Sequence, residues 1–226
     1  TQSFKKMIVF SKEGKFIEDV FVPEEIQDMP HYDLIIDDDS LYVKESQFEK
    51  INLVTARGCP MECSFCAVGD QKITAQDPEV VIKELSYIVS QKNALGQIAQ
   101  ISIQDNFFAQ NPKRAKVISQ LIIEYREKTG ALFEWDVQTR VEQFKDRDLA
   151  AVMKKAGCSE AYFGVENFDP MMLKVLNKAH NPQKYLRQTI QAIENCLIYG
   201  ITPHIDFQVG IPGETPETEK TNAAAL

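Results

Sequence analysis

Apolar residues follow two alternating patterns from residue 51 onward. Short apolar runs predict five strands, at 51–56, 98–104, 132–138, 161–165 and 204–209. Between them, apolar residues three and four positions apart predict helices. Two of these helices follow Asn111-Pro112 and Asn181-Pro182, each a helix-start signal, and end before Gly130 and Gly200.

Strands that alternate with helices predict an α/β fold with a parallel sheet, either an open doubly wound sheet or a barrel. The long loop that separates the first strand from its helix, up to about residue 76, is expected to be functional. In the helix at 182–199, the residues predicted to face the core are Leu186, Ile190, Ile193 and Leu197.

Residues 1–50 depart from this pattern. Two β-like runs at 7–10 and 15–22 around Glu13-Gly14 predict a hairpin, and an acidic, proline-containing stretch follows as a linker. We therefore expect two units, a hairpin with a linker at 1–50 that ends a missing upstream domain, and a core at 51–226. Because the chain starts at Thr1 and stops within an alanine-rich helical stretch, we expect the core to be incomplete at its C-terminus.

Composition and charge narrow the function. The 226 residues are 44% apolar and 26% charged, as in ordinary globular proteins. The formal net charge is −8 and no block of Lys and Arg interrupts it, so nucleic acid is an unlikely partner. No apolar run reaches the roughly 18 residues of a membrane helix, and we expect a soluble, cytoplasmic protein.

Three of the five cysteines fall within eight residues, as Cys59-x3-Cys63-x2-Cys66. Thiolates on one short loop can converge on a metal centre, either zinc or an iron–sulfur cluster. Zinc usually takes a fourth protein ligand, whereas a cubane cluster held by three cysteines leaves one iron open. Cys158 and Cys196 stand alone and are predicted to be buried thiols. A non-catalytic zinc or iron–sulfur module therefore remains an alternative to an enzyme.

With an aromatic residue, Phe65, just before the third cysteine, this spacing resembles that of the radical S-adenosylmethionine (SAM) enzymes. In that family the three thiolates, here Cys59, Cys63 and Cys66, bind a [4Fe-4S] cluster and SAM chelates the open iron. Electron transfer then splits SAM into methionine and a 5′-deoxyadenosyl radical that acts on an organic substrate. The resemblance implies a partial (β/α)6 TIM-like barrel, truncated here after strand five.

The resemblance continues at the ends of the other strands, where α/β barrels place their active sites. After the second strand, Gln104 and Asp105 stand where the family contacts the SAM amino group; otherwise Asp105 is a helix-start residue. After the third strand, Arg140 matches a family arginine that can pair with the SAM carboxylate, or with a neighbouring acid.

The fourth and fifth strands end in similar family runs. Glu166 is implied to bind the ribose hydroxyls and Lys178 the methionine carboxylate, although Lys178 also reads as a solvated lysine at a helix end. Gly210, in the run at 208–215, is implied to let the backbone approach the adenine. Phe65 is implied to pack on the adenine.

The linker at 28–34 resembles that of radical SAM proteins with an upstream cobalamin-binding domain. This implies cobalamin in the full-length protein, and a cobalamin-dependent methyltransferase or cyclase, with a tRNA-modifying radical SAM enzyme as the alternative. The partners implied are a small-molecule or lipid-like substrate and an electron donor of the flavodoxin or ferredoxin type.

Overall fold

The centre of the fold is a parallel sheet of five strands. The computed structural model describes residues 6–10, 16–21, 50–94 and 96–225. The sheet consists, in spatial order, of β3 (Ile51–Leu53), β6 (Ala99–Ile103), β7 (Phe133–Thr139), β8 (Cys158–Glu166) and β9 (Thr202–Phe207). Every neighbouring pair is parallel. The predicted α/β class is confirmed, and the sheet is open, as in a partial TIM-like barrel.

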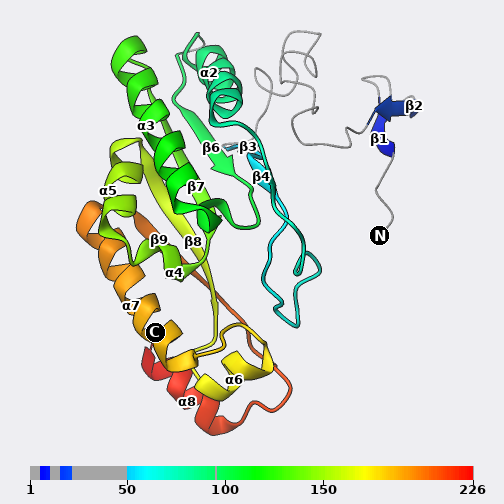
Figure 1. Ribbon diagram of the computed structural model, residues 1–226, viewed down its shortest axis with the longest axis vertical. Coiled ribbons are helices and arrows are strands. Elements are labelled where there is room, and N and C mark those ends of the chain that lie inside the picture. Colours follow the sequence, from blue (N-terminus) through cyan, green and yellow to red (C-terminus); the bar gives the residue numbers. More distant parts are fainter. Residues whose placement is uncertain (1–5, 11–15, 22–49, 95, 226) are drawn as a thin grey trace.

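Four helices cover one face of this sheet (Figure 1). They are α2 (Pro78–Ala94), α3 (Pro112–Thr129), α5 (Arg147–Lys155) and α7 (Pro182–Tyr199). The remaining helical elements are η2 (Phe108–Gln110), α4 (Val141–Phe144), α6 (Pro170–Val175) and α8 (Pro216–Ala225). Helix α3 begins and ends as predicted, because the Asn111 side chain accepts hydrogen bonds from two N–H groups of the first turn and Gly130 adopts the left-handed conformation.

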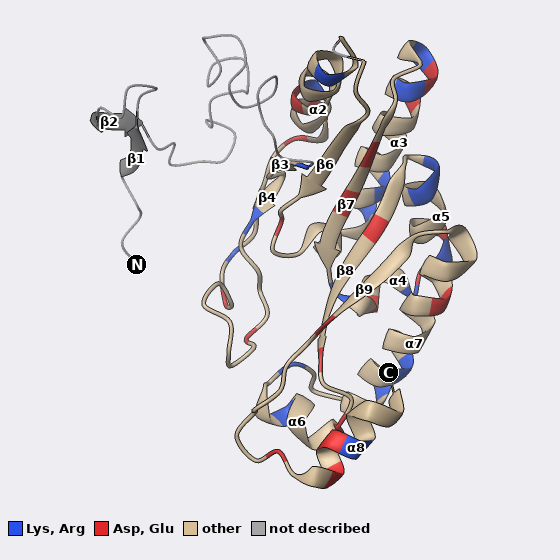
Figure 2. Ribbon diagram, turned by 180° about the vertical axis from the view of Figure 1, so that it is seen from behind, with Lys and Arg blue, Asp and Glu red and all other residues tan. Residues whose placement is uncertain are grey.

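The strand register separates apolar from polar side chains. Ile101, Trp135 and Cys158 are neighbours across β6, β7 and β8, and all three are buried in the core beneath the helices. One position further along, Ser102 pairs with Asp136, and Asp136 with Glu160. Figure 2 shows acidic positions on the central strands β7 and β8. The second face of the sheet is therefore polar.

Helix α7 packs only partly through the predicted face. Leu186 packs against the core and Ile193 is half-buried. Ile190 and Leu197 are exposed, whereas its buried residues are Pro182, Tyr185, Gln188, Thr189, Ala192, Asn195 and Cys196. The buried polar groups find partners there. Asn195 donates to the Phe144 carbonyl at 2.7 Å, and the Tyr185 hydroxyl to the Gly164 carbonyl at 2.8 Å. Hydrogen bonding thus outweighs the apolar periodicity of this helix.

Several strand boundaries also differ from the prediction, and the fifth strand runs over Thr202–Phe207 where 204–209 was expected. The first strand ends at Leu53, and Ala56–Arg57 forms a separate strand, β4, antiparallel to β5 (Thr74–Ala75). The fourth strand begins earlier than predicted, at Cys158.

The N-terminal hairpin prediction is confirmed, with β1 (Lys6–Phe10) antiparallel to β2 (Phe16–Phe21). The linker that resembles that of cobalamin-carrying proteins lies outside the described residues. Within the described part of the chain, none of the helices has the length and apolar character to cross a membrane.

Candidate cofactor site at the strand ends

The three clustered cysteines lie on one excursion of the chain, residues 55–76, which we call the cysteine loop. Pairing of β4 with β5 closes its base. Cys59 is buried, Cys63 half-buried and Cys66 exposed, and all three are free thiols. Gly58 precedes them with a φ of 89°, and a Cβ there would lie 2.3 Å from the Lys72 carbonyl oxygen. Only glycine therefore fits where the two sides of the loop approach.

The cysteine loop reaches the segment that follows the fourth strand of the main sheet. Ser64 N–H donates to the Leu176 carbonyl at 2.9 Å, and the Asn177 side chain donates to the Glu62 carbonyl at 2.8 Å. The cysteine loop, which follows the edge strand β3, is thus held against the end of α6, which follows β8, the fourth strand in the spatial order of the sheet. This contact brings the cysteines close to Arg140 and Lys178.

Within the described residues, no group of three or more His, Cys, Asp or Glu side chains converges closely enough to hold a metal ion. The chemistry of the donors nevertheless suits an anionic thiolate cluster. Three free thiols lie within eight residues, and Nη1 of Arg140 is 3.7 Å from Cys63 Sγ. A guanidinium is an appropriate neighbour for negatively charged sulfur.

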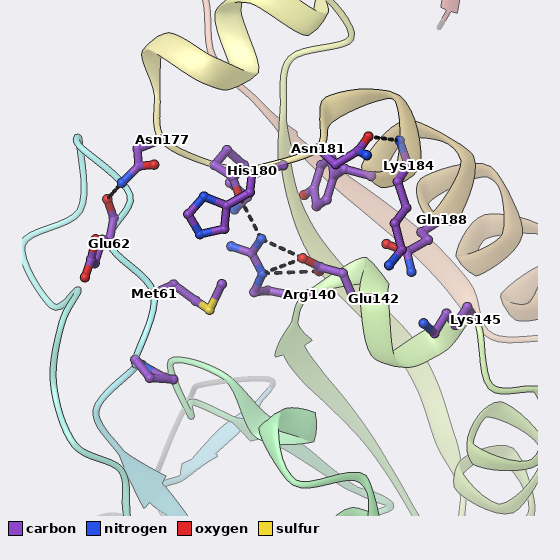
Figure 3. A pocket seen from close by; sticks show the side chains of 14 residues that line it. Met61, Glu62, Arg140, Glu142, Lys145, Asn177, His180, Asn181, Lys184 and Gln188 are labelled. Carbon is purple, nitrogen blue, oxygen red and sulfur yellow. Dashed lines mark hydrogen bonds and ion pairs between the residues drawn. The ribbon is translucent and has the colours of Figure 1, made fainter.

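Arg140 is the most connected side chain near the loop. Its guanidinium forms a bidentate ion pair with Glu142 (2.7 Å at Nη2) and donates to the Lys178 carbonyl at 2.8 Å. Burial disfavours its charge, but hydrogen bonding to Glu142 raises its pKa above the usual value. Figure 3 shows Arg140 between Met61 and Glu142 in a cavity of 590 Å³. Arg140 is therefore committed to a neighbouring acid, one of the two predicted alternatives.

Glu166 and Lys178 form a buried ion pair at 3.0 Å. The second carboxylate oxygen of Glu166 accepts from the Gln208 amide at 2.8 Å. A Cβ on Gly164 would lie 2.5 Å from Glu166 Oε1 and 3.0 Å from Lys178 Nζ, so a larger residue there would force the pair to shift. Lys178 Nζ also lies 5.8 Å from the centre of the Phe65 ring, which is 42% exposed. Glu166 and Lys178, which were predicted to bind different groups of SAM, thus contact each other, and Lys178 also lies near Phe65, a third predicted SAM contact.

Asp105 points into the protein, toward the base of the cysteine loop. Its oxygens accept from Thr55 N–H at 2.6 Å, Ala56 N–H at 2.9 Å and the Thr55 hydroxyl at 2.5 Å. Burial raises its pKa above the ordinary value. Its neighbour Gln104 is exposed, donates to the Ser102 hydroxyl at 2.7 Å and lines a second cavity, of 300 Å³, on the polar face of the sheet.

Gly210 lies on the rim with a φ of 78° and open space around it. Its N–H and that of Ile211 both donate to one oxygen of Glu214, at 2.5 and 2.9 Å. The other oxygen of Glu214 accepts from Asn167 at 3.2 Å. The backbone groups expected to read an adenine are here occupied by the carboxylate of the same run.

Sequence reasoning did not single out Arg114 or Thr55. Arg114 lies in the first turn of α3 and its guanidinium reaches the carbonyls of Thr55 and Gln76, which flank the cysteine loop. No local pattern distinguishes this arginine from a solvated one. The sequence predicted only that Arg114 lies near the start of a helix, from the helix-start pattern Asn111-Pro112 that precedes it.

Comparison with known proteins agrees with this arrangement. A family model described as the Radical SAM superfamily matches residues 53–224. An uncharacterized methyltransferase of Pyrococcus horikoshii is 33% identical over 168 residues, which is 73% of this chain and 34% of that protein. A hopanoid C-2 methylase of Rhodopseudomonas palustris is 24% identical over 95% of this chain and 37% of that protein. The chain spans about a third of the length of these two relatives.

Among solved structures, the cobalamin-dependent SAM radical enzyme OxsB superposes with a TM-score of 0.72, at 19% identity, over 97% of this chain and 31% of that chain. The radical SAM methyltransferase TsrM of Kitasatospora setae, solved with cobalamin and a [4Fe-4S] cluster, gives a TM-score of 0.66 at 22% identity, over 77% of this chain and 31% of that chain. At these identities the likeness establishes a common fold.

Proposed function

Because this chain belongs to the Radical SAM superfamily, we propose that Cys59, Cys63 and Cys66 hold a [4Fe-4S] cluster at which SAM is reductively cleaved. The observation that carries the proposal is the position of three free thiols on one loop, next to Arg140, within the segment that matches the family. When bound, the cluster supplies the electron that cleaves SAM to methionine and a 5′-deoxyadenosyl radical, which then acts on an organic substrate.

The side chains around the loop bind and orient SAM in this proposal. Lys178 carries the cation suited to the methionine carboxylate, and Glu166 the acceptors suited to ribose hydroxyls, and the two stabilise each other as a buried pair until SAM arrives. Phe65 presents an exposed ring face to the adenine, and Gln104 and Gly210 are exposed at the strand ends. Arg140 stabilises the negative charge of the cluster from beside Cys63.

For the complete protein we propose a methyl transfer or cyclisation that depends on cobalamin. Support comes from relatives named as methyltransferase, methylase and cyclase and from neighbours solved with cobalamin. The polar cavity lined by Gln104, Asp136, Tyr162 and Asp206 favours a small molecule with hydrogen-bonding groups over a lipid-like substrate. A flavodoxin or ferredoxin-type donor in the cytoplasm would deliver the electron.

The test is anaerobic reconstitution of the complete protein with iron and sulfide. We expect about four irons per chain, a brown chromophore and 5′-deoxyadenosine on reduction with SAM. Cys63→Ala should lose the cluster and the product, whereas Cys196→Ala, which alters an isolated buried thiol, should retain both. Stoichiometric zinc in place of iron, or unchanged SAM cleavage by Cys63→Ala, would refute the proposal.

The SAM contacts have a separate test. Lys178→Gln should leave the iron content unchanged and weaken SAM binding by about tenfold or more, the usual cost of losing a charge-assisted contact. Lys174→Gln is the matched control, because Lys174 is exposed in the last turn of α6, the short helix that ends just before Lys178. Equal SAM affinity in both variants would exclude Lys178 from the binding site.

A further inference from the structure

We propose that Asp105 and Arg114 are positioning residues that fix the base of the cysteine loop, and that Asp105 does not contact SAM. This inference rests on the proposed function, in which the loop holds a cluster. It assigns a role to a carboxylate that the family resemblance implied to contact SAM, and to an arginine to which the sequence analysis gave no role.

Asp105 binds the strand side of the loop base. Immediately after β3, the N–H groups of Thr55 and Ala56 and the Thr55 hydroxyl all donate to its two oxygens. Thr55 and Asp105 are fully buried. Both oxygens of the carboxylate are therefore engaged away from solvent, and an ammonium group of SAM would have to displace buried backbone donors to reach them.

Arg114 joins the two sides of the loop base. Its Nη2 donates to the Thr55 carbonyl at 2.9 Å and to the Gln76 carbonyl at 3.0 Å, and its Nε donates to the Gln76 carbonyl at 3.3 Å. Gln76 N–H closes the ring by donating to the Thr55 carbonyl at 2.9 Å. One guanidinium on α3 thus ties together the residues at which the loop leaves the sheet and returns to it.

Asp105 and Arg114 meet at Thr55. The Thr55 hydroxyl donates to Asp105 and accepts from Arg114 Nη1 at 3.3 Å. Burial lowers the pKa of Arg114 from its usual value, and the charge of Asp105 opposes this change. The neighbouring Asn106 accepts from Gly58 N–H at 3.3 Å. Two consecutive residues at the end of β6 thus hold three N–H groups just ahead of Cys59.

A loop fixed at its base holds its thiols within a narrow range of positions, and cluster binding is sensitive to such support. The consequence is specific. Loss of the Asp105 charge, or of the hydrogen bonds from the Arg114 guanidinium, should weaken the binding of iron by the cysteines. The protein molecules that still carry a cluster should bind SAM with unchanged affinity. Substitution of a residue that binds SAM should instead weaken SAM binding and leave iron retention unchanged.

The experiment compares Asp105→Asn and Arg114→Gln with the wild-type complete protein after anaerobic reconstitution. We expect iron retention against a chelator to fall by about 10–100-fold, an altered electron paramagnetic resonance signal of the reduced cluster, and unchanged SAM affinity of the loaded fraction. Lys113→Gln and Asp148→Asn, which alter exposed charges on α3 and α5, should match wild type in all three. A wild-type signal and iron retention with SAM binding at least about tenfold weaker in Asp105→Asn would overturn the proposal.

A second pair of variants applies if those two fail to fold. Thr55→Val removes the hydroxyl that joins both residues, and Thr55→Ser keeps it. Hydrogen exchange of the iron-free chain should be faster across residues 55–76 in Thr55→Val, unchanged in the sheet, and restored in Thr55→Ser. Equal exchange of this loop in all three forms would refute the positioning role of Asp105 and Arg114, whether or not the wild-type protein binds iron. A wild-type protein that binds no iron would by itself refute only the proposed function.

Discussion

The two faces of the sheet differ in what holds them together. Beneath the helices, Trp135, Ile101 and Cys158 are buried side by side, and the Phe108 ring meets the Trp135 indole edge-on, with centroids 5.9 Å apart. On the other face Asp136, next to Trp135 in sequence, accepts from the Ser102 hydroxyl at 2.6 Å and from Lys50 at 2.9 Å. The Tyr162 ring stacks on His204 on that face.

This difference shows how one strand separates stability from chemistry. Parallel strands in α/β proteins are commonly apolar on both faces because helices cover both, whereas strands that alternate have one face turned to something other than a helix. In β7 the sequence FEWDVQT alternates throughout. The apolar half supplies the burial that folds the protein, and Asp136 and Gln138 of the polar half line a cavity.

The largest loss of stability should follow from removing a buried side chain of the apolar face. Trp135→Ala removes the largest fully buried side chain and should lower the free energy of unfolding by about 3–5 kcal/mol. Trp135→Phe should cost about 1–3 kcal/mol, because the Ala156 carbonyl loses the indole N–H at 3.0 Å. Urea denaturation measures both. A cost for Trp135→Ala below that of Trp135→Phe would mean that the helices do not seal this face.

The adjacent residue on the polar face should matter less to stability. Asp136→Asn keeps an acceptor for Ser102 but loses the ion pair with Lys50, which is partly exposed, so we expect a loss of about 1–2 kcal/mol in urea denaturation. Ser102→Ala, which removes the hydroxyl that donates to Asp136, should be measured alongside it. An effect equal to that of Trp135→Ala would remove the distinction between the faces.

The polar face should also make stability depend on pH. Hydrogen bonding from Tyr162, and then from Lys50, holds the pKa of Glu160 below its ordinary value of 4.5. Its contribution to stability is therefore complete above pH 4.5 and is lost as the pH falls through the lower pKa of the folded state. Glu160→Gln should flatten the acid limb of a plot of unfolding midpoint against pH. A slope like that of wild type would show that Glu160 is not stabilised by these contacts.

The smallest effect is expected on the outer surface of α7. Leu197 is 63% exposed, so Leu197→Ser should change the free energy of unfolding by no more than about 0.5 kcal/mol. Thermal denaturation of the chain gives the value, and Cys196→Leu, which overfills a buried position on the same helix, gives the contrasting loss. A loss of several kcal/mol for Leu197→Ser would mean that the Leu197 side chain is buried and not exposed to solvent.

Local signals made much of the fold predictable. The start and end of α3 depend on Asn111, Pro112 and Gly130, whose effects act within one turn of the helix, and the structure confirms them. The buried face of α7 was predicted only in part, because Tyr185 and Asn195 bury their polar groups against carbonyls of β8 and α4, which are distant in sequence. Periodicity counts apolar residues and has no information about such partners.

For the candidate site residues, the sequence predicted positions at strand ends but not the contacts that the side chains make. Glu166 and Lys178 come from the rim expected of strand ends, yet their ion pair depends on the path of the chain between them. The partners of Asp105 are backbone N–H groups about fifty residues earlier, and no pattern of side chains marks those. The same holds for Arg114, whose acceptors are backbone carbonyls.

Gly164 has an evolutionary consequence. Because a methyl group added there would displace the Glu166 carboxylate and crowd the Lys178 ammonium, the ion pair would have to shift to make room for it. Descendants of this gene that keep both paired side chains should therefore retain the glycine more often than those that have exchanged one of them.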